Sequence, residues 1–316
     1  MSNDPGLAAD SCMFMEALPG DGGAHNASDI WWLSPDVSLN AAHDTVKLTV
    51  HRKSADSGCV TSFSESLTVE LWAAGASLAM VPNNPSSAKN VQNIGAQVPA
   101  EGAAATATML FHPPLGFDHL DPHHPHAVCL VARCYPDSLT PSTQGFFAPD
   151  DQHVAQHNLC VVPTPVTGIN ITPQPQVVQS SQVTTVNPSA STQQVKLFAI
   201  ADRRPSNFVK KTVSSQLHDT HGLLRLGSTP ARSFKFVLPD FPDAQVIDHS
   251  HPSAITPLSP QTYEAKIKLA PGQLTKFTFT ADLAGGQSGD VYIFHLRQIG
   301  SDNHDQGGLT LVMIAG

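Results

Sequence analysis

Apolar and polar residues alternate along most of this chain, and this period of two restricts the fold to β-structure. In residues 44–53, Val46, Leu48 and Val50 share one face, while polar side chains occupy the other face. Residues 274–281 repeat the pattern in the second half. No stretch carries an apolar stripe of period 3.6 over three turns, as an amphipathic helix would. We therefore predict an all-β protein.

The alternating runs fall into two series of about seven, the strand number typical of an immunoglobulin-like β-sandwich. The predicted strands of the first half are 30–33, 44–53, 65–72, 91–98, 103–111, 126–135 and 153–162. Those of the second half are 177–186, 194–200, 232–238, 262–269, 274–281, 291–299 and 309–314. The pattern predicts two tandem immunoglobulin-like sandwiches.

The length of 316 residues also fits two domains of roughly 100–200 residues each. We predict an N-terminal arm at 1–28, a first sandwich at 29–163, a connection at 164–175 and a second sandwich at 176–316. The prolines of the connection stiffen the chain and cannot donate to a central ladder. An edge strand with proline at its ends is the alternative interpretation of this segment.

Several short motifs of the first half follow one another in a characteristic order. They are Leu71-Trp72-Ala73, Ile94-Gly95, Pro99-Ala100-Glu101-Gly102, Val128-Cys129-Leu130-Val131-Ala132-Arg133 and Val154-Ala155-Gln156-His157-Asn158. Over residues 29–162 the chain thereby resembles the bacterial CARDB-like (cell-adhesion-related) immunoglobulin-like domains. The second half, with Gly289-Asp290-Val291-Tyr292, is less specifically similar to another bacterial immunoglobulin-like domain.

This resemblance implies a sandwich fold and an accessory, adhesive or spacer role, and it supplies no catalytic residues. The chain departs from the family pattern at Asp151-Gln152-His153, where the family often has Asp-Asn-Asn. A segment rich in histidine and proline is also inserted before Val128. Since one fold hosts many functions, the resemblance leaves the partner open.

The charge balance argues against nucleic-acid binding. The chain has 17 Lys and Arg against 26 Asp and Glu, a net charge of −9. Without a basic face, the release of counterions that dominates nucleic-acid affinity is missing, and so is attraction to an anionic membrane. We expect a protein partner, self-association or a larger assembly instead.

We expect neither a secretory signal nor membrane insertion. No Lys or Arg precedes Lys47, and a signal needs a positive start before an apolar run. The apolar stretch at 71–81 is shorter than the ~20 residues that span a bilayer. We therefore expect cytoplasmic synthesis, with incorporation into a particle or surface assembly as a further expectation.

The five cysteines match neither a zinc pattern nor a redox pair. They are Cys12, Cys59, Cys129, Cys134 and Cys160. A Cys59–Cys134 or Cys129–Cys160 bridge is compatible with oxidising conditions. We favour reduced thiols, because cysteine in a strand commonly serves as a small buried hydrophobe.

The loop 112–126 concentrates histidine. Five of the 16 histidines and two aspartates fall there, namely His112, His119, His123, His124, His126, Asp118 and Asp121. Imidazole and carboxylate bind divalent transition metals, and the first-choice ligands would be His123, His124, His126 and Asp121. The favoured alternative is a proline-stiffened loop with neutral histidines, exposed or in contact with a partner, so no cofactor is expected.

Adjacent tryptophans on a strand place one ring on each face. Trp31 and Trp32 therefore predict one ring in the core and the other at the surface or under the arm. Contact of a ring with a protein partner or a sugar is the functional alternative. Core packing is favoured, because large aromatic side chains mostly bury their area.

No motif with a catalytic mechanism is present: we find no Gly-x-Ser-x-Gly elbow, Walker loop or dinucleotide fingerprint. The leading hypothesis is a non-enzymatic structural or interaction protein, a subunit or decoration of a larger bacterial or phage-like assembly that acts through sandwich surfaces and edge strands. The alternatives are a module that binds metal or glycan at loop 112–126, and a metal-dependent hydrolase. If the 1–28 arm donates a strand, its removal should abolish assembly and leave both domains folded.

Overall fold

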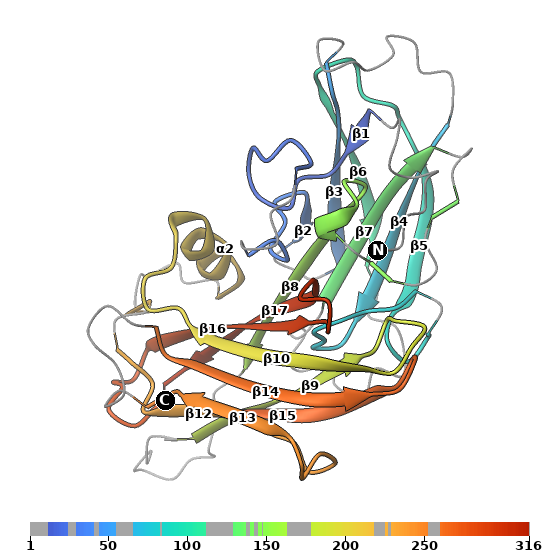
Figure 1. Cartoon of the computed structure of the whole chain (residues 1–316). Coiled ribbons are helices and arrows are strands. Elements are labelled where there is room, and N and C mark those ends of the chain that lie inside the picture. The colour runs from blue at the N-terminus through green and yellow to red at the C-terminus, as the bar shows by residue number, and fades with distance from the viewer. Residues whose placement is uncertain are drawn as a thin grey trace. The chain divides into compact units, whose positions relative to one another are not determined.

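The structure is a computed structural model of the whole chain, and Figure 1 shows its elements. It describes residues 12–24, 30–40, 44–54, 66–82, 84–111, 129–136, 140–141, 145–146, 148–162, 178–217, 225–226, 229–251 and 260–315. Strands dominate these residues, so the all-β class is confirmed. The chain divides into two compact units. The described residues of unit 1 lie in Met1–Ala74, Ala79–Asp118 and Cys129–Asn158, and those of unit 2 in Gly75–Leu78 and Leu159–Gly316.

Unit 1 has a sandwich-like architecture of two antiparallel sheets. The first sheet is formed by β1 (Met13–Phe14), β2 (Val37–Leu39), β3 (Thr45–Arg52) and β6 (Ala104–Leu110). Its central strand β3 pairs with β6 on one side and with β1 and β2 on the other. The second sheet has the order β5-β4-β7-β8, formed by β4 (Leu67–Ala74), β5 (Lys89–Ala96), β7 (Cys129–Pro136) and the first part of β8 (Val154–Val162). A short 3-10 helix, Ala148–Asp150, precedes β8.

The core of unit 1 follows from the alternation seen in the sequence. In β3, Val46, Leu48 and Val50 are buried, as the period of two predicts. Strand β8 differs, because all nine of its residues are buried and no exposed face alternates with a buried one. The segment before β2 packs along β8: the Ser34 N–H donates to the Gln156 carbonyl at 2.8 Å. The predicted strand 30–33 is therefore only a single bridge, between Leu33 and His157.

Residues 12–24 of the segment predicted as an arm are described, and the first of them are built into unit 1. Met13 and Phe14 pair with Arg52 and His51 at the end of β3. Met13, Met15 and Ala17 are fully buried. Deleting residues 1–28 would remove these core side chains, so such a deletion would destabilise unit 1 and could not report on assembly alone.

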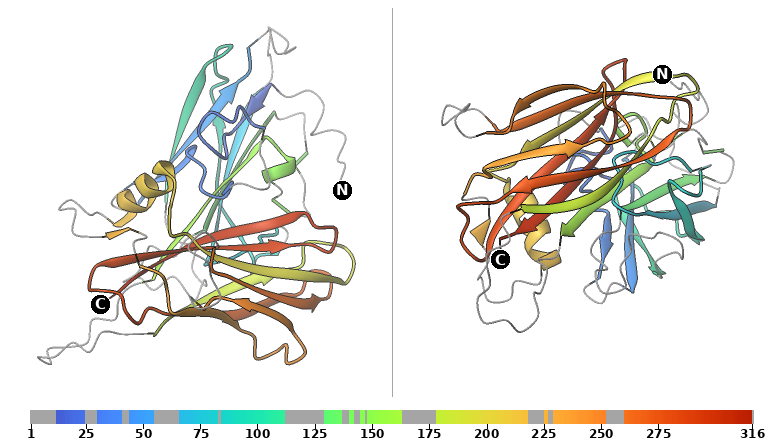
Figure 2. Two further views of the ribbon diagram at one scale, coloured as in Figure 1. Left: turned by 60° about the vertical axis from the view of Figure 1, so that its left-hand side comes forward. Right: turned by 90° about the horizontal axis from the view of Figure 1, so that it is seen from below.

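Unit 2 also has two sheets. The larger has the order β13-β14-β10-β16-β17, with β17 parallel to residues 159–162 of β8; its strands are β10 (Gln193–Ala201), β13 (Gln245–His249), β14 (Thr262–Leu269), β16 (Asp290–Ile299) and β17 (Asp305–Ile314). Strand β11 (Arg225–Leu226) runs parallel to the start of β16. The smaller sheet has the order β12-β15-β9, formed by β9 (Val178–Val186), β12 (Ser233–Val237) and β15 (Leu274–Asp282). Figure 2 shows the strands of unit 2 from two further sides.

An aromatic cluster joins the two sheets of unit 2. Phe279 of β15 lies 5.2 Å from Phe294 of β16, centroid to centroid, and Phe236 of β12 lies 5.7 Å from Tyr263 of β14. Such tilted and edge-to-face pairs contribute about 0.5–1.5 kcal/mol each beyond the area they bury. The alternating Phe residues of the sequence thus form the core that holds this sandwich-like unit together.

The structure contains an α-helix that the sequence pattern did not predict. Helix α2 (Asn207–Leu217) spans 11 residues, and its buried side chains are Val209 and Val213. The Val209 N–H donates to the Ser206 hydroxyl at 3.2 Å, an N-terminal cap. Two buried residues four apart make too narrow a stripe to stand out as a helical pattern. No helix among the described residues is long and apolar enough to cross a membrane.

The cysteines differ in part from the expectation. Cys129, Cys134 and Cys160 are buried thiols, so neither proposed bridge forms. Burial raises the pKa of Cys160 to about 12, which keeps this thiol protonated. Cys12, expected as a reduced thiol, is disulfide-bonded. The packing of residues 12–17 against β3, which local sequence does not reveal, brings Cys12 into the folded unit.

Candidate functional site

Of the candidate site residues predicted from the sequence, the structure describes the two tryptophans but not the histidine-rich loop. The whole loop 112–126, with His123, His124, His126 and Asp121, lies outside the described residues, so its metal site stays a prediction. Trp31 and Trp32 are both buried in unit 1, in an edge-to-face pair with centroids 5.6 Å apart. Neither ring lies at the surface, where contact with a partner would require it.

Two other histidines lie in the interior of unit 1. His153 is buried, and its Nδ1 lies 2.7 Å from Asp151 Oδ1. The Nδ1 of His157 lies 3.3 Å from the Ser34 carbonyl oxygen. Burial outweighs this hydrogen bond and lowers the pKa of His157, so the ring is neutral at pH 7.

Two of the five motifs on which the family resemblance depends contribute to one buried cluster. Trp72 of β4 lies opposite Val131 of β7, so the Leu-Trp-Ala and Cys-Leu-Val-Ala-Arg motifs are neighbours in the sheet. The Glu70 Oε2 accepts hydrogen bonds from Arg133 Nη2 at 2.5 Å, from Arg133 Nε at 2.9 Å and from Trp72 Nε1 at 3.0 Å. The Tyr135 hydroxyl donates to Oε1 at 2.8 Å.

This cluster is nearly buried and is flanked by aromatic rings. The Arg133 guanidinium lies 5.6 Å from the Trp72 ring centroid and 5.1 Å from that of Phe146. Burial would raise the pKa of Glu70, but the charge of Arg133 and the hydrogen bonds of Glu70 hold it below its ordinary value. The ion pair therefore stays charged, and its role is to fix β4 against β7.

A triad-like chain of hydrogen bonds occurs in unit 2. Thr310 Oγ1 lies 3.0 Å from His295 Nδ1, and His295 Nε2 lies 3.0 Å from Asp202 Oδ2. The order of groups matches a nucleophile, a base and an orienting acid. Thr310 is fully buried and His295 nearly so, and a nucleophile without access cannot reach a substrate. This chain of groups therefore carries no proposal of hydrolysis.

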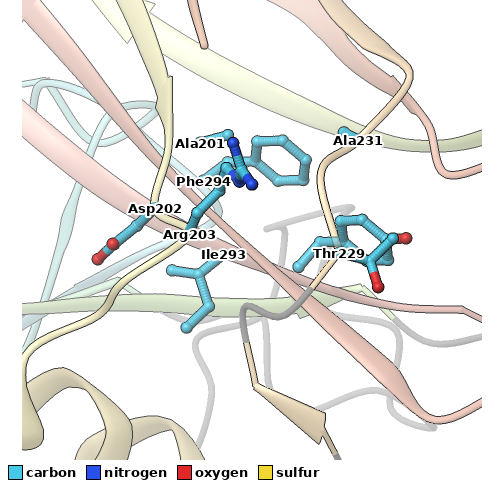
Figure 3. Close-up of a pocket in the computed structure, with 8 residues that line it drawn as sticks. Ala201, Asp202, Arg203, Thr229, Ala231, Ile293 and Phe294 are labelled. Atoms are coloured by element: carbon cyan, nitrogen blue, oxygen red, sulfur yellow. The ribbon is translucent and has the colours of Figure 1, made fainter. Parts of the chain in front are cut away.

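A small pocket lies on the same unit (Figure 3). It is lined by Ala201, Asp202, Arg203, Thr229, Ala231, Tyr292, Ile293 and Phe294. Its empty volume of about 210 Å³ includes open solvent. Ligand pockets usually measure about 300–1,000 Å³, so this pocket is too small for a typical organic ligand.

Asp290 holds one wall of this pocket in place. Its carboxylate accepts hydrogen bonds from Arg225 Nε at 2.7 Å, Thr229 Oγ1 at 3.0 Å and the Gln287 N–H at 2.8 Å. Burial would raise the pKa of Asp290, but these hydrogen bonds and the charge of Arg225 hold it below its ordinary value of 3.8.

We expect Asp290 to stabilise unit 2 in a pH-dependent manner. Because the pKa of Asp290 is lowered in the folded state, its contribution to the free energy of unfolding is fully present above pH 3.8, the ordinary pKa of the group. This contribution is lost as the pH falls through the folded-state pKa. The difference in unfolding free energy between wild type and Asp290→Asn should therefore shrink between pH 7 and about pH 3. Urea unfolding followed by circular dichroism measures it, and a difference that stays constant with pH would contradict the assignment.

The edge strand β13 exposes two adjacent large apolar side chains. All five of its residues, Gln245–His249, are exposed, and Val246 and Ile247 are 48% and 47% exposed. Among the described strands β13 pairs only with β14, and its other edge carries no partner. The strand contains neither Lys nor Pro, the residues that commonly protect an edge.

Two other edges in the described part of the chain are better protected, whereas β6 also pairs on one side only, with β3, and contains neither Lys nor Pro. The free side of β9 is covered at Thr184, whose N–H donates to the Ala76 carbonyl at 2.8 Å. Edge strand β5 carries Lys89 and amide side chains such as Asn90 and Asn93, which hydrogen-bond to each other at 2.7 Å. Strand β13 is a candidate binding edge, because it exposes the adjacent apolar side chains of Val246 and Ile247. The sequence analysis missed it, because Val246 and Ile247 are adjacent and do not alternate.

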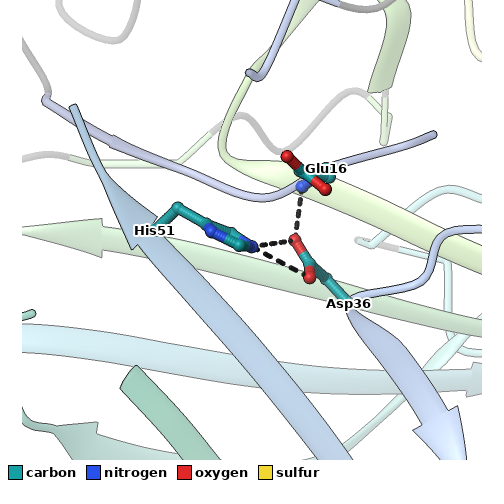
Figure 4. Close-up of side chains that lie close together, drawn as sticks. All are labelled: Glu16, Asp36 and His51. Atoms are coloured by element: carbon teal, nitrogen blue, oxygen red, sulfur yellow. Dashed lines mark hydrogen bonds and ion pairs between the residues drawn. The ribbon is translucent and has the colours of Figure 1, made fainter. Parts of the chain in front are cut away.

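A second cluster missed in the sequence joins three segments of unit 1. Asp36 lies just before β2, His51 is in β3 and Glu16 follows β1; Figure 4 shows these three side chains. His51 Nε2 lies 3.0 Å from each carboxylate oxygen of Asp36. The Glu16 N–H donates to Asp36 Oδ2 at 2.5 Å. Only the fold could reveal this cluster, because its members are 15 and 20 residues apart in sequence.

No family model and no curated protein matches the chain. Solved structures with partial similarity include red sea bream transglutaminase (TM-score 0.19, 11% identity, 85% of this chain and 28% of that chain). A second is a Bacteroides uniformis β-glucuronidase, with a TM-score of 0.26 and 13% identity over 97% of this chain and 32% of that chain. A third is the Amycolatopsis orientalis exo-chitosanase CsxA, with a TM-score of 0.21 and 12% identity over 87% of this chain and 26% of that chain. The chain spans about a third or less of the length of these structures. Similarity at this level carries no argument about the activity of this chain.

Proposed function

We propose that this chain is a non-enzymatic interaction protein that associates with a second copy of itself by pairing of the exposed edge strand β13. The observation that carries the proposal is the unprotected edge with Val246 and Ile247 about half exposed. An open edge presents unpaired N–H and C=O groups that an added strand can satisfy. Assembly through edges is the route by which such a protein would act as a subunit of a larger structure.

The sequence of β13 suits pairing with its own copy. In an antiparallel pair centred on Ile247, each Ile247 lies opposite the other, Val246 lies opposite Asp248, and Gln245 lies opposite His249. Directly opposed apolar side chains contribute about 0.2–1 kcal/mol per pair relative to alanine. A twofold interface of this kind is self-complementary, which is the commonest symmetry of soluble oligomers.

We further propose that both units are immunoglobulin-like sandwiches and that unit 1 is CARDB-like. Support comes from two of the motifs, Leu-Trp-Ala and Cys-Leu-Val-Ala-Arg, which lie in register on β4 and β7 beside Glu70. The two-sheet architecture of each unit agrees with the proposal. The family's accessory or adhesive role fits a protein that works by binding.

The test is a charge placed on the edge. We expect wild-type protein to self-associate with increasing concentration in sedimentation velocity, and Ile247→Lys to weaken association by about tenfold or more. A lysine opposed by its own copy adds repulsion and removes apolar contact. The matched control is Val178→Lys in β9, which is 57% exposed in the same unit and should leave association unchanged.

Two outcomes would contradict the proposal. Wild-type protein that stays monomeric over the whole accessible concentration range would exclude pairing of two copies. Equal weakening by Val178→Lys and Ile247→Lys would show that association does not depend on β13. Binding of another protein at β13 in place of a second copy would appear as a monomer whose complex is lost in Ile247→Lys.

A further inference from the structure

We propose that Glu16, Asp36 and His51 form a binding site for one divalent transition-metal ion, with Zn²⁺ the best match. The three side chains offer one imidazole nitrogen and two carboxylate oxygens, and these ligand atoms all lie within 4.8 Å of one another. None of the three residues belongs to loop 112–126 or to the β13 edge, so the inference does not depend on the proposed function.

The spacing of the ligand atoms suits a small ion. Zinc binds nitrogen and carboxylate oxygen at about 2.0–2.2 Å, which places neighbouring ligand atoms of a tetrahedral site roughly 3.3 Å apart. The observed 3.0 Å between His51 Nε2 and the Asp36 oxygens is close to that separation. Three protein ligands leave a fourth position for water.

The ligands are held in place by the surrounding fold. The His51 ring stacks on Phe14, with centroids 5.1 Å apart and planes inclined by 19°. The Asp36 N–H donates to Ser34 Oγ at 3.0 Å, and the Gly20 N–H donates to Glu16 Oε2 at 2.9 Å. Such outer contacts orient metal ligands, and a preorganised site loses less entropy on binding.

The charges and the exposure also favour a cation. Asp36 is nearly buried, and its carboxylate lies close to that of Glu16. The cluster has two carboxylates against one imidazole, so a further positive charge would balance it. A divalent ion would supply it. Glu16 is partly exposed and the His51 side chain is 24% exposed, which gives an ion access.

The site would fasten three segments of unit 1 to one another. Glu16 belongs to the N-terminal segment, Asp36 to the residues before β2 and His51 to the central strand β3. An ion that binds only the folded state stabilises it in proportion to the logarithm of its concentration. At a hundredfold excess over Kd, we expect the melting temperature to rise by about 5 °C or more.

The test uses untagged full-length protein, freed of metal with a chelator and titrated with Zn²⁺ by calorimetry and thermal melting. We expect Glu16→Gln and His51→Gln each to weaken zinc binding by about 10–100-fold and to remove the rise in melting temperature. Glu16→Gln keeps the shape of a partly exposed side chain, so it tests the site even if His51→Gln fails to fold. Cobalt(II) as a probe should give visible absorption bands in wild type that Glu16→Gln changes.

Two controls separate this site from other histidines. The triple variant His123→Ala, His124→Ala, His126→Ala removes the histidines of the predicted loop site, and His251→Gln removes an exposed histidine that pairs with Asp248. Both should retain the zinc response. A wild-type protein without a zinc-dependent rise in melting temperature would overturn the inference. So would a response that survives in Glu16→Gln and His51→Gln.

Discussion

Replacing Arg133 with methionine is expected to lower the free energy of unfolding of unit 1 by about 3–5 kcal/mol. The guanidinium donates two hydrogen bonds to Glu70 Oε2, and both side chains are nearly buried. The substitution keeps an apolar chain of similar length, but it leaves the Glu70 carboxylate as a buried charge without its partner. Urea unfolding followed by tryptophan fluorescence reports on unit 1 alone, because Trp31, Trp32 and Trp72 all belong to it.

The double variant Glu70→Gln/Arg133→Met separates the lost pair from the orphaned charge. It should be less destabilised than Arg133→Met, because no ionised group is left alone in the interior. Lys47→Met is the matched control, since Lys47 is an exposed residue of β3 in the same unit, and this change should alter stability by no more than about 0.5 kcal/mol. A loss below about 1 kcal/mol in Arg133→Met would show that the cluster does not fix β4 against β7.

The substitutions Met13→Ala and Met15→Ala should each lower the free energy of unfolding by about 2–5 kcal/mol, the usual range for truncation of a buried methionine. Both side chains are fully buried, and Met13 pairs with Arg52 at the end of β3. A free N-terminal arm would predict no change at all. The measurement is again tryptophan fluorescence against urea.

The control for this prediction is Leu110→Ala in β6. Leu110 is 68% exposed, so its truncation should change stability by no more than about 0.5 kcal/mol. If Met13→Ala and Met15→Ala behave like Leu110→Ala, the N-terminal segment does not belong to the core of unit 1.

Strand positions could be predicted well, because burial of one face of a sheet imposes a period of two on the sequence. The predicted 262–269 is the strand Thr262–Leu269, and the predicted 274–281 is the strand Leu274–Asp282. Elements with little burial or with burial on both faces leave no such pattern. For this reason β13, which is exposed throughout, was missed, and so was α2, which buries only Val209 and Val213.

The candidate sites depended on contacts over long sequence distances. Glu70 and Arg133 are 63 residues apart and meet because β4 and β7 are neighbours in one sheet. Glu16, Asp36 and His51 meet because residues 13 and 14 pair with the end of β3. Trp31 and Trp32 are both buried, so the alternative of one ring at the surface does not hold. Their segment is held against β8 by single contacts and not by a regular ladder.

The amino-acid sequence by itself determined the all-β class and most strands, because alternation is a local property that burial of one sheet face imposes. The tertiary structure alone decided that residues 12–17 are core, that β13 is an open edge and that two carboxylates and an imidazole meet beside Phe14. Those features depend on which strands pair and in which register. Pairing is a contact between distant parts of the chain, and a local pattern does not encode it.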